Sequence, residues 1–141
     1  MIDPRTNAIE VSKLIDAPPE VVFDYLTDPQ KFVEWMGVGA ELDPRPGGAY
    51  RIVVSEKEAA SGEYQVIEPP HRLVLTWGWE RDPELPPGST VVEITLTPRG
   101  EGTELVLRHS GLPNATRRDQ HAGGWALYLG RLEARFGSGR C

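Results

Sequence analysis

The chain has 141 residues, of which 39% are hydrophobic and 26% charged, with a net charge of −6 and a pI near 5.1. These values are typical of one soluble globular domain that is large enough to bury a core. The excess of acidic residues excludes a protein that holds nucleic acid or an anionic membrane surface by electrostatics. No apolar run approaches the roughly 20 residues that span a bilayer, and no apolar signal core follows Met1.

The residue types that carry common catalytic and metal chemistry are sparse. Cys141 is the single cysteine and the last residue, so it cannot close an internal disulfide, which favours a reducing cytoplasm. The three histidines show no metal-ligand spacing. Ser110 beside His109 is not a catalytic pair, because neighbouring strand residues point to opposite faces. The sequence therefore predicts a cytoplasmic domain without a metal or a tightly bound cofactor.

The first third of the chain combines one strand with two short helices. Residues 9–15 alternate between apolar and polar side chains, which predicts a strand. Pro18 suits the entry to a helix, and residues 21–26 form a short helical pattern after it. Asp28 followed by Pro29 is typical of an N-cap and first helical residue, so a second, very short helix is expected there.

The middle of the chain consists of strands and turns. Residues 82–88 contain three prolines and no periodicity, which indicates a loop, and residues 99–102 are typical of a hairpin connection. Consecutive strands joined by turns favour an antiparallel meander over alternating βαβ units. The predicted strands span residues 49–55, 62–67, 72–79, 90–97 and 103–110, with a weaker one near Glu41.

The last predicted element is a long amphipathic helix over residues 116–136, with Thr116 as its N-cap. Such a helix must bury its apolar stripe against another element, and the predicted sheet supplies the surface. We therefore expect an α+β domain over residues 1–141, with a core at about 9–136. In it, a curved antiparallel sheet of about six to seven strands wraps around the helix. The apolar stripe consists of Trp125, Leu129, Leu132 and Phe136.

Several short motifs occur together in an order that resembles a known family. They are residues 17–23 (APPEVVF), Asp28-Pro29 with Trp35, Pro46-Gly47-Gly48, residues 62–64 and 67–73, Thr76-Trp77, residues 109–113 and Gly124-Trp125. Over most of the chain they resemble the single-domain bacterial relatives of the C-terminal domain of the Hsp90 ATPase activator. That group belongs to the START-like superfamily, also called SRPBCC or Bet v 1-like. The resemblance implies the helix-grip fold, which agrees with the arrangement expected from periodicity.

The same resemblance implies a class of function only broadly. Members of the superfamily enclose an apolar cavity between sheet and long helix, and in various branches it holds lipids, polyketides or other hydrophobic molecules. Some branches are enzymes, some carriers and some sensors, and a fold does not select among them. The eukaryotic activator engages Hsp90 with an additional N-terminal domain, for which 141 residues leave no room. An Hsp90-type chaperone is therefore not the favoured partner.

The aromatic residues are the best candidates for a binding site. Ligand pockets are mostly apolar and aromatic, and Trp and Tyr carry a polar atom that suits a cavity wall, although ordinary core packing explains any one of them. His109 shares a strand face with apolar residues, whereas His121, in the first turns of the helix, is expected either to be hydrogen-bonded to a backbone carbonyl or to be exposed. Two adjacent glycines, Gly123 and Gly124, suggest that a strand or a ligand approaches the helix, or that its first turn is frayed. The predicted ligand-binding residues are Trp35, Tyr64, Trp77, Trp79, His109, Trp125, Tyr128 and Leu129.

Three functions follow from these features. The first is binding of an apolar or amphipathic small molecule in an internal cavity, with His109 and Tyr64 orienting it. The second is a cyclase-type or hydrolase-type enzyme that uses the same cavity, with His109 as acid–base. The third is a chaperone or stress-response interaction module, which predicts a filled interior and an exposed apolar patch. A homodimer would be one way to protect the sheet edges.

Overall fold

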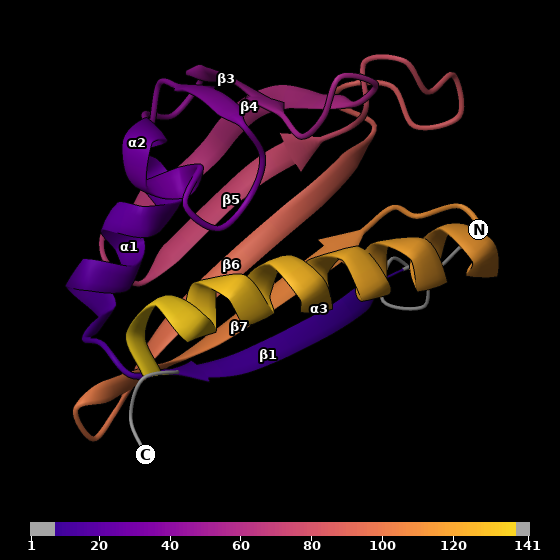
Figure 1. The fold of residues 1–141 in the computed structure, drawn as a ribbon. Helices are drawn as coiled ribbons and strands as arrows, with labels where there is room; N and C mark the ends of the chain where they lie inside the picture. Colours follow the sequence, from indigo (N-terminus) through magenta and orange to yellow (C-terminus); the bar gives the residue numbers. More distant parts are fainter. Residues whose placement is uncertain (1–7, 138–141) are drawn as a thin grey trace.

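A computed structural model describes residues 8–137 of the chain, so Cys141 and the residues around Met1 lie outside the described part. Seven strands form one antiparallel sheet, and the long helix α3 crosses its inner face (Figure 1). This arrangement confirms the predicted α+β helix-grip fold. The helices are α1 (Pro19–Thr27), α2 (Pro29–Phe32) and α3 (Ala115–Gly137). The strands are β1 (Ile9–Ile15), β2 (Gly39–Leu42), β3 (Ala49–Val53), β4 (Ala59–Glu68), β5 (Arg72–Trp77), β6 (Thr90–Arg99) and β7 (Gly102–Ser110).

The order of the strands is β1-β7-β6-β5-β4-β3-β2, so the first two strands lie at opposite edges of the sheet. Helices α1 and α2 carry the chain from one edge to the other, and β2 to β7 then follow as a meander. The register pairs Trp77 on β5 with Thr90 on β6, and Val92 on β6 with His109 on β7. Three strands thus bring Trp77, Thr90 and His109 close together under α3.

The helix starts follow local capping chemistry, with one correction. The side chain of Asp28 accepts a hydrogen bond from the backbone N–H of Gln30 at 2.9 Å, as predicted for an N-cap. For α3 the predicted cap at Thr116 is wrong. The Asn114 side chain accepts from the N–H of Arg117 at 2.9 Å, so the helix starts one residue earlier than expected. Asparagine caps as well as serine or threonine, and it satisfies one of the unpaired N–H groups of the first turn.

Strand β5 ends at Trp77, two residues before its predicted end. A Cβ at Gly78 would lie 1.9 Å from the carbonyl oxygen of Pro86, so only glycine lets the proline-rich loop approach here. Beyond Gly78, Trp79 keeps only an isolated bridge to Ala60. The chain therefore leaves the sheet at the point where it faces the beginning of α3.

The core lies between the sheet and the helices. Leu129 and Leu132 of α3 are fully buried in it, together with apolar side chains of α1 and the inner faces of the strands. At the C-terminal end of α3, Phe136 packs edge-on against Tyr25 of α1, with ring centroids 5.0 Å apart. Within the described residues, no helix has the length and apolar character needed to cross a membrane.

Candidate ligand-binding cleft

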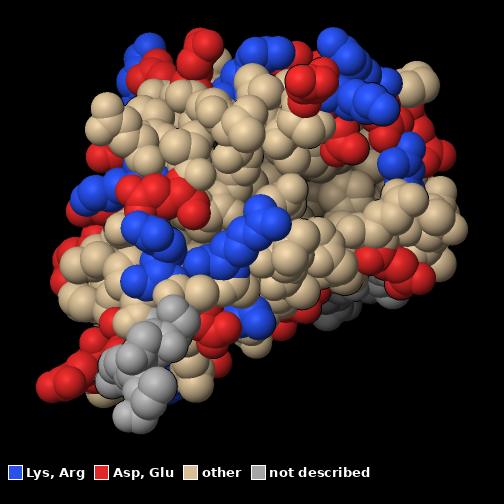
Figure 2. Space-filling view, in the orientation of Figure 1, with Lys and Arg blue, Asp and Glu red and all other residues tan. Residues whose placement is uncertain are grey.

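A cleft of about 590 Å³ opens beside the N-terminal half of α3. Its other walls come from the turn between β3 and β4 and from the segment that follows β5. Figure 2 shows the hollow between α3 and this loop region, with charged side chains on its rim. The volume falls within the range of about 300–1,000 Å³ that is usual for small-molecule sites. The cleft is lined by Met36, Val54, Lys57, Glu58, Ala59, Trp77, Trp79, Arg81, Asp82, Pro83, Arg117, Gln120, His121, Gly124, Trp125, Leu127 and Tyr128.

Three tryptophans form the apolar wall of the cleft. The ring of Trp77 lies at the centre of the group, with centroids 5.7 Å from Trp79 and 5.0 Å from Trp125. Trp77 and Trp125 are buried, whereas Trp79 is half-buried and closer to the opening. Tilted and edge-on contacts of this kind suit aromatic quadrupoles, so the cluster is a rigid surface for an apolar ligand.

His121 fixes the position of Trp79 beside the helix. The Nδ1–H of His121 donates to the carbonyl oxygen of Arg117 at 2.8 Å, one turn earlier in α3. Its Nε2 is therefore the unprotonated nitrogen, and it accepts from the indole N–H of Trp79 at 3.0 Å. Of the two alternatives expected for His121, the hydrogen bond to a backbone carbonyl is confirmed. Exposure is wrong, because the side chain is buried at 8% exposure between the helix and the departing β5 segment.

His109 makes a second, deeper set of hydrogen bonds. Its Nδ1 accepts from the indole N–H of Trp125 at 3.0 Å. The hydroxyl of Thr90 donates to the carbonyl oxygen of Trp77 at 2.8 Å, so Thr90 accepts from the Nε2–H of His109, also at 2.8 Å. Both nitrogens of this fully buried ring are thus occupied. His109 supports Trp125 from behind and does not line the cleft.

Both imidazoles are held in the neutral form. Burial, aided by the neighbouring His121, lowers the pKa of His109 from 6.5 to about 3. Burial also lowers the pKa of His121, although its hydrogen bond to the Arg117 carbonyl acts in the opposite direction. The two rings lie 5.0 Å apart, and a charge on one would disfavour a charge on the other. At neutral pH the histidines therefore act as hydrogen-bond acceptors for two tryptophans.

The indole N–H of Trp77 has no hydrogen-bond partner among the described residues, although the side chain is only 2% exposed. A buried donor left in this way costs on the order of 1–3 kcal/mol. The other indoles of the cluster, those of Trp79 and Trp125, each donate to a histidine. The centre of the aromatic wall is therefore its least satisfied point.

Gly124 leaves open space on the cleft side of α3. A Cβ added at Gly124 or at Gly123 would meet no heavy atom within 4 Å. No strand therefore packs closely against the glycine pair, so the suggestion that a strand approaches the helix here is wrong. Gly124 lines the cleft, whereas Gly123 faces solvent. The two neighbours thus offer a matched pair for mutagenesis.

The rim nearest the helix start is held by a cluster of charges. The Arg117 guanidinium lies 2.7 Å from a carboxylate oxygen of Asp82 and 2.7 Å from one of Glu84. Asp82 also accepts from the backbone N–H groups of Glu84 and Leu85, at 3.0 and 3.3 Å. These contacts fasten the loop after β5 to α3 and fix the width of the opening.

The structure divides the predicted site residues among three places. Trp77, Trp79, Trp125 and Tyr128 line the cleft. A separate inner void of about 20 Å³, room for roughly one water molecule, is bordered by Trp77, Trp125 and the two remaining aromatics. These two are Trp35, whose indole donates to the Tyr25 carbonyl, and Tyr64. The third place is the core behind the cleft, where His109 lies behind Trp125 and Leu129 packs among the buried apolar side chains.

Of the lining residues that sequence reasoning missed, some lie on α3, such as Arg117, Gln120 and Leu127, and others lie in turns and loops. Lys57 and Glu58 come from the β3–β4 turn, and Arg81 and Asp82 from the segment after β5. No periodicity marks such residues, and only the proline-rich stretch that follows signals a long loop. Within residues 8–137, no group of three or more His, Cys, Asp or Glu side chains is placed to hold a metal ion.

The comparisons with known proteins agree with this architecture. Residues 16–137 match the model of a protein family described as activator of Hsp90 ATPase homolog 1-like protein. The chain belongs to this family. Comparison with functionally curated proteins gives no match.

Solved structures of this family and fold extend the comparison. An AHSA1-like protein from Rhizobium etli is 43% identical, with a TM-score of 0.71 over 92% of this chain and 83% of that one. A protein of the dynemicin biosynthetic locus is 25% identical, with a TM-score of 0.79 over 90% of this chain but only 46% of its own. An Hsp90 activator from Plasmodium falciparum shares the fold, with a TM-score of 0.76, 23% identity and coverage of 91% and 94%. The structures that share this fold thus include an Hsp90 activator and a protein of a biosynthetic locus.

Proposed function

We propose that this AHSA1-like chain binds an apolar or amphipathic small molecule in the cleft beside α3. The observation that carries the proposal is the wall of three tryptophans facing the open space at Gly124. A wall of this kind supplies a large apolar contact area. Helix α3 carries three interior glycines, Gly123, Gly124 and Gly130, and each forgoes about 1 kcal/mol relative to alanine. The cost at Gly124 is accounted for if the space beside it is needed by a ligand.

The arrangement of the histidines favours binding over acid–base catalysis. A catalytic base works best with a pKa near the operating pH, whereas the pKa of His109 is about 3 and both its nitrogens are hydrogen-bonded. His121 does line the cleft, but its lone pair accepts from Trp79. The two imidazole rings are therefore suited to holding the indoles of Trp79 and Trp125 in place, and an apolar ligand needs such a fixed surface to pack against.

The third candidate, an interaction module, predicts a filled interior without a pocket. The cleft of about 590 Å³ argues against that expectation. The exposed large apolar residues of the described part are Leu14, Val21, Val38 and Leu127, of which Leu127 lies at the cleft itself. The similar structures include both a biosynthetic-locus protein and an Hsp90 activator, so similarity supports neither activity over the other.

The test blocks the cleft with a larger side chain at Gly124. Gly124→Leu places a side chain in the space beside Trp125, whereas Gly123→Leu places the same side chain in solvent. Binding of the neutral fluorophore N-phenyl-1-naphthylamine would be followed by tryptophan quenching and by probe emission. We expect binding by the wild type and by Gly123→Leu, with at least about tenfold weaker binding by Gly124→Leu, because a filled site loses most of its apolar contact.

Thermal unfolding of each variant provides the control for folding. Equal binding by Gly124→Leu and Gly123→Leu would place the probe elsewhere and contradict the proposal. Absence of binding by the wild type, for this probe and for a panel of fatty acids, sterols and flavonoids, would also contradict it.

A further inference from the structure

Most Lys and Arg side chains of the described part form ion pairs with carboxylates, and a few do not. Across residues 8–137 most Lys and Arg side chains have a carboxylate within ion-pair distance, as expected for a chain with a net charge of −6. The exceptions in this range are Lys57, Arg81, Arg118 and Arg131. An acidic chain that leaves particular cations without partners leaves them available to an external anion.

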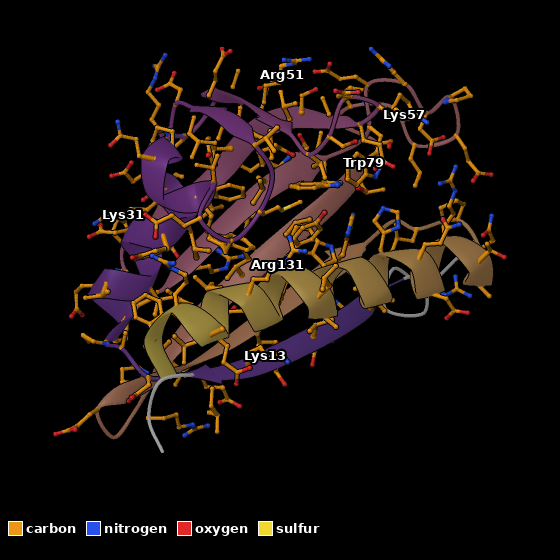
Figure 3. All side chains as sticks on the ribbon, viewed as in Figure 1. Lys13, Lys31, Arg51, Lys57, Trp79 and Arg131 are labelled. Atoms are coloured by element: carbon orange, nitrogen blue, oxygen red, sulfur yellow. The ribbon has the colours of Figure 1, made fainter. Side chains whose placement is uncertain are left out.

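Two of these four cations, Lys57 and Arg81, line the cleft. The guanidinium of Arg131 lies over the ring of Tyr128, another lining residue, at 5.3 Å from the centroid. Figure 3 shows Lys57 above Trp79, with Arg131 on the helix that forms the opposite wall. The fourth cation, Arg118, is on α3 but does not line the cleft.

The backbone keeps Lys57 and Arg81 on adjacent segments. The N–H of Glu80 donates to the carbonyl oxygen of Ala59 at 2.9 Å, and Trp79 forms a bridge with Ala60. Two like charges held on neighbouring segments repel each other, and an anion between them relieves that repulsion. Both side chains are exposed, so they can reach a group at the mouth of the cleft.

The acidic residues that line the cleft do not cancel these charges. Asp82 is committed to Arg117 and to two backbone N–H groups of its own turn. Glu58 forms no ion pair with a described residue, and its negative charge is felt by His121, on the inner side of the cleft. Lys57 and Arg81 are therefore the cations of the lining that no carboxylate pairs, and Glu58 is the one lining carboxylate among the described residues without an ion pair.

We propose that the ligand of this cleft is an anionic amphiphile, an apolar ring system or chain with one acidic group. Its apolar body lies against Trp77, Trp79 and Trp125, and its acid group is bound by Lys57 and Arg81. This inference rests on the proposed binding function and adds the charge of the ligand to it. An exposed ion pair contributes about 0.2–1 kcal/mol, which corresponds to an affinity change of about 1.4- to 5-fold for each cation.

The experiment compares two fluorophores that share one ring system. 1-Anilinonaphthalene-8-sulfonate carries a negative charge, and N-phenyl-1-naphthylamine carries none. Dissociation constants for both would be measured with the wild type, Lys57→Gln, Arg81→Gln and the double variant. Arg118→Gln serves as the matched control, since it removes one equally unpaired cation away from the cleft. Thermal unfolding confirms that each variant is folded.

We expect the wild type to bind the sulfonate more tightly than the neutral probe. Lys57→Gln and Arg81→Gln should each weaken sulfonate binding by about two- to fivefold, and neither should change binding of the neutral probe. Arg118→Gln should bind both probes as the wild type does. Higher salt should weaken only sulfonate binding. Sulfonate binding that is insensitive to Lys57 and Arg81, while the neutral probe still binds, overturns the anionic inference and leaves the proposed function standing. Absence of binding by both probes overturns both.

Discussion

The two halves of α3 meet the sheet in different ways. The C-terminal half is closed: Leu129 and Leu132 are fully buried, and Phe136 packs against Tyr25 of α1. The N-terminal half is open: it carries a glycine pair, faces the cleft and contacts the sheet through hydrogen-bonded tryptophans and histidines. One helix thus combines a half that stabilises the fold with a half that leaves room for a ligand.

The comparison also separates two kinds of interaction. Close apolar packing at the closed end gives large and non-specific stabilisation. At the open end, the indole N–H groups of Trp79 and Trp125 each donate to an imidazole nitrogen, so these two rings are fixed in orientation even though they border empty space. The predictions below test whether stability and binding divide between the halves in this way.

The largest effect is expected from truncation at the closed end. Leu132→Ala removes a fully buried side chain and should lower the free energy of unfolding by about 2–5 kcal/mol. Leu127→Ala, at the open end, removes a side chain that is 54% exposed and should cost less than about 0.5 kcal/mol. Urea unfolding monitored by circular dichroism measures both. Equal losses would show that the two halves contribute alike.

The next effect is a dependence of stability on pH that arises at the open end. The pKa of His109 is about 3 in the folded chain and 6.5 without burial, so the unfolded chain takes up the proton first as the pH falls. The stability contributed by the neutral ring is complete above pH 6.5 and is lost as the pH falls toward 3. Wild type should lose about 1.4 kcal/mol per pH unit more than His109→Gln between pH 6 and 4.

His71→Gln provides the control for the pH experiment, since this residue is exposed in the β4–β5 turn. Denaturant unfolding at several pH values should give wild-type behaviour for His71→Gln and a shallower pH dependence for His109→Gln. Curves for His109→Gln that run parallel to those of the wild type would contradict the assignment of a buried neutral ring.

A smaller effect separates helix propensity from binding. Gly123→Ala and Gly124→Ala should each stabilise the fold by up to about 1 kcal/mol, because alanine is favoured in a helix and neither Cβ meets a neighbour within 4 Å. Differential scanning calorimetry would detect the rise in melting temperature. Only Gly124→Ala should also weaken ligand binding. Destabilisation by Gly124→Ala would mean that the glycine serves the fold itself.

The smallest effect is expected from the exposed ion pairs at either end. Arg135→Gln breaks the contact with Glu34 at the closed end and should cost less than about 1 kcal/mol. Arg117→Gln releases Asp82 and Glu84 at the open end and should be similarly small in stability. The tryptophan emission spectrum should distinguish them, since Arg117 anchors the loop next to Trp79 and Arg135 does not. Unchanged emission in both variants would contradict that anchoring role.

The sequence predicted the closed end well, because periodic burial determines it. Leu129 and Leu132 follow the helical stripe, and the strand over residues 9–15 has the bounds expected from its alternation. The cap of α3 was misplaced because Asn114 and Thr116 are both capable of capping, and only the path of the preceding chain decides between them.

The open end was predicted only in part. Tryptophans indicate a candidate site because ligand pockets are mostly apolar and aromatic. The hydrogen-bond partners of Trp79 and Trp125, however, depend on contacts between residues far apart in the chain. For His121 the sequence left a backbone-carbonyl partner and exposure open, because its place near the helix start says nothing about the β5 segment that covers it. Lys57 and Arg81 carry no periodic signal, and their unpaired state is visible only in the structure, where most other cations of the described part have a carboxylate within ion-pair distance.

The separation of the two halves has a consequence for how such a chain can evolve. The cleft is lined by the segments 54–59, 77–83 and 117–128, which contribute few of the fully buried aliphatic side chains. Substitutions in these segments alter the shape and charge of the binding surface while the leucines at the closed end keep the fold intact. Single substitutions can therefore change the shape and charge of this cleft in a lineage while the fold is kept.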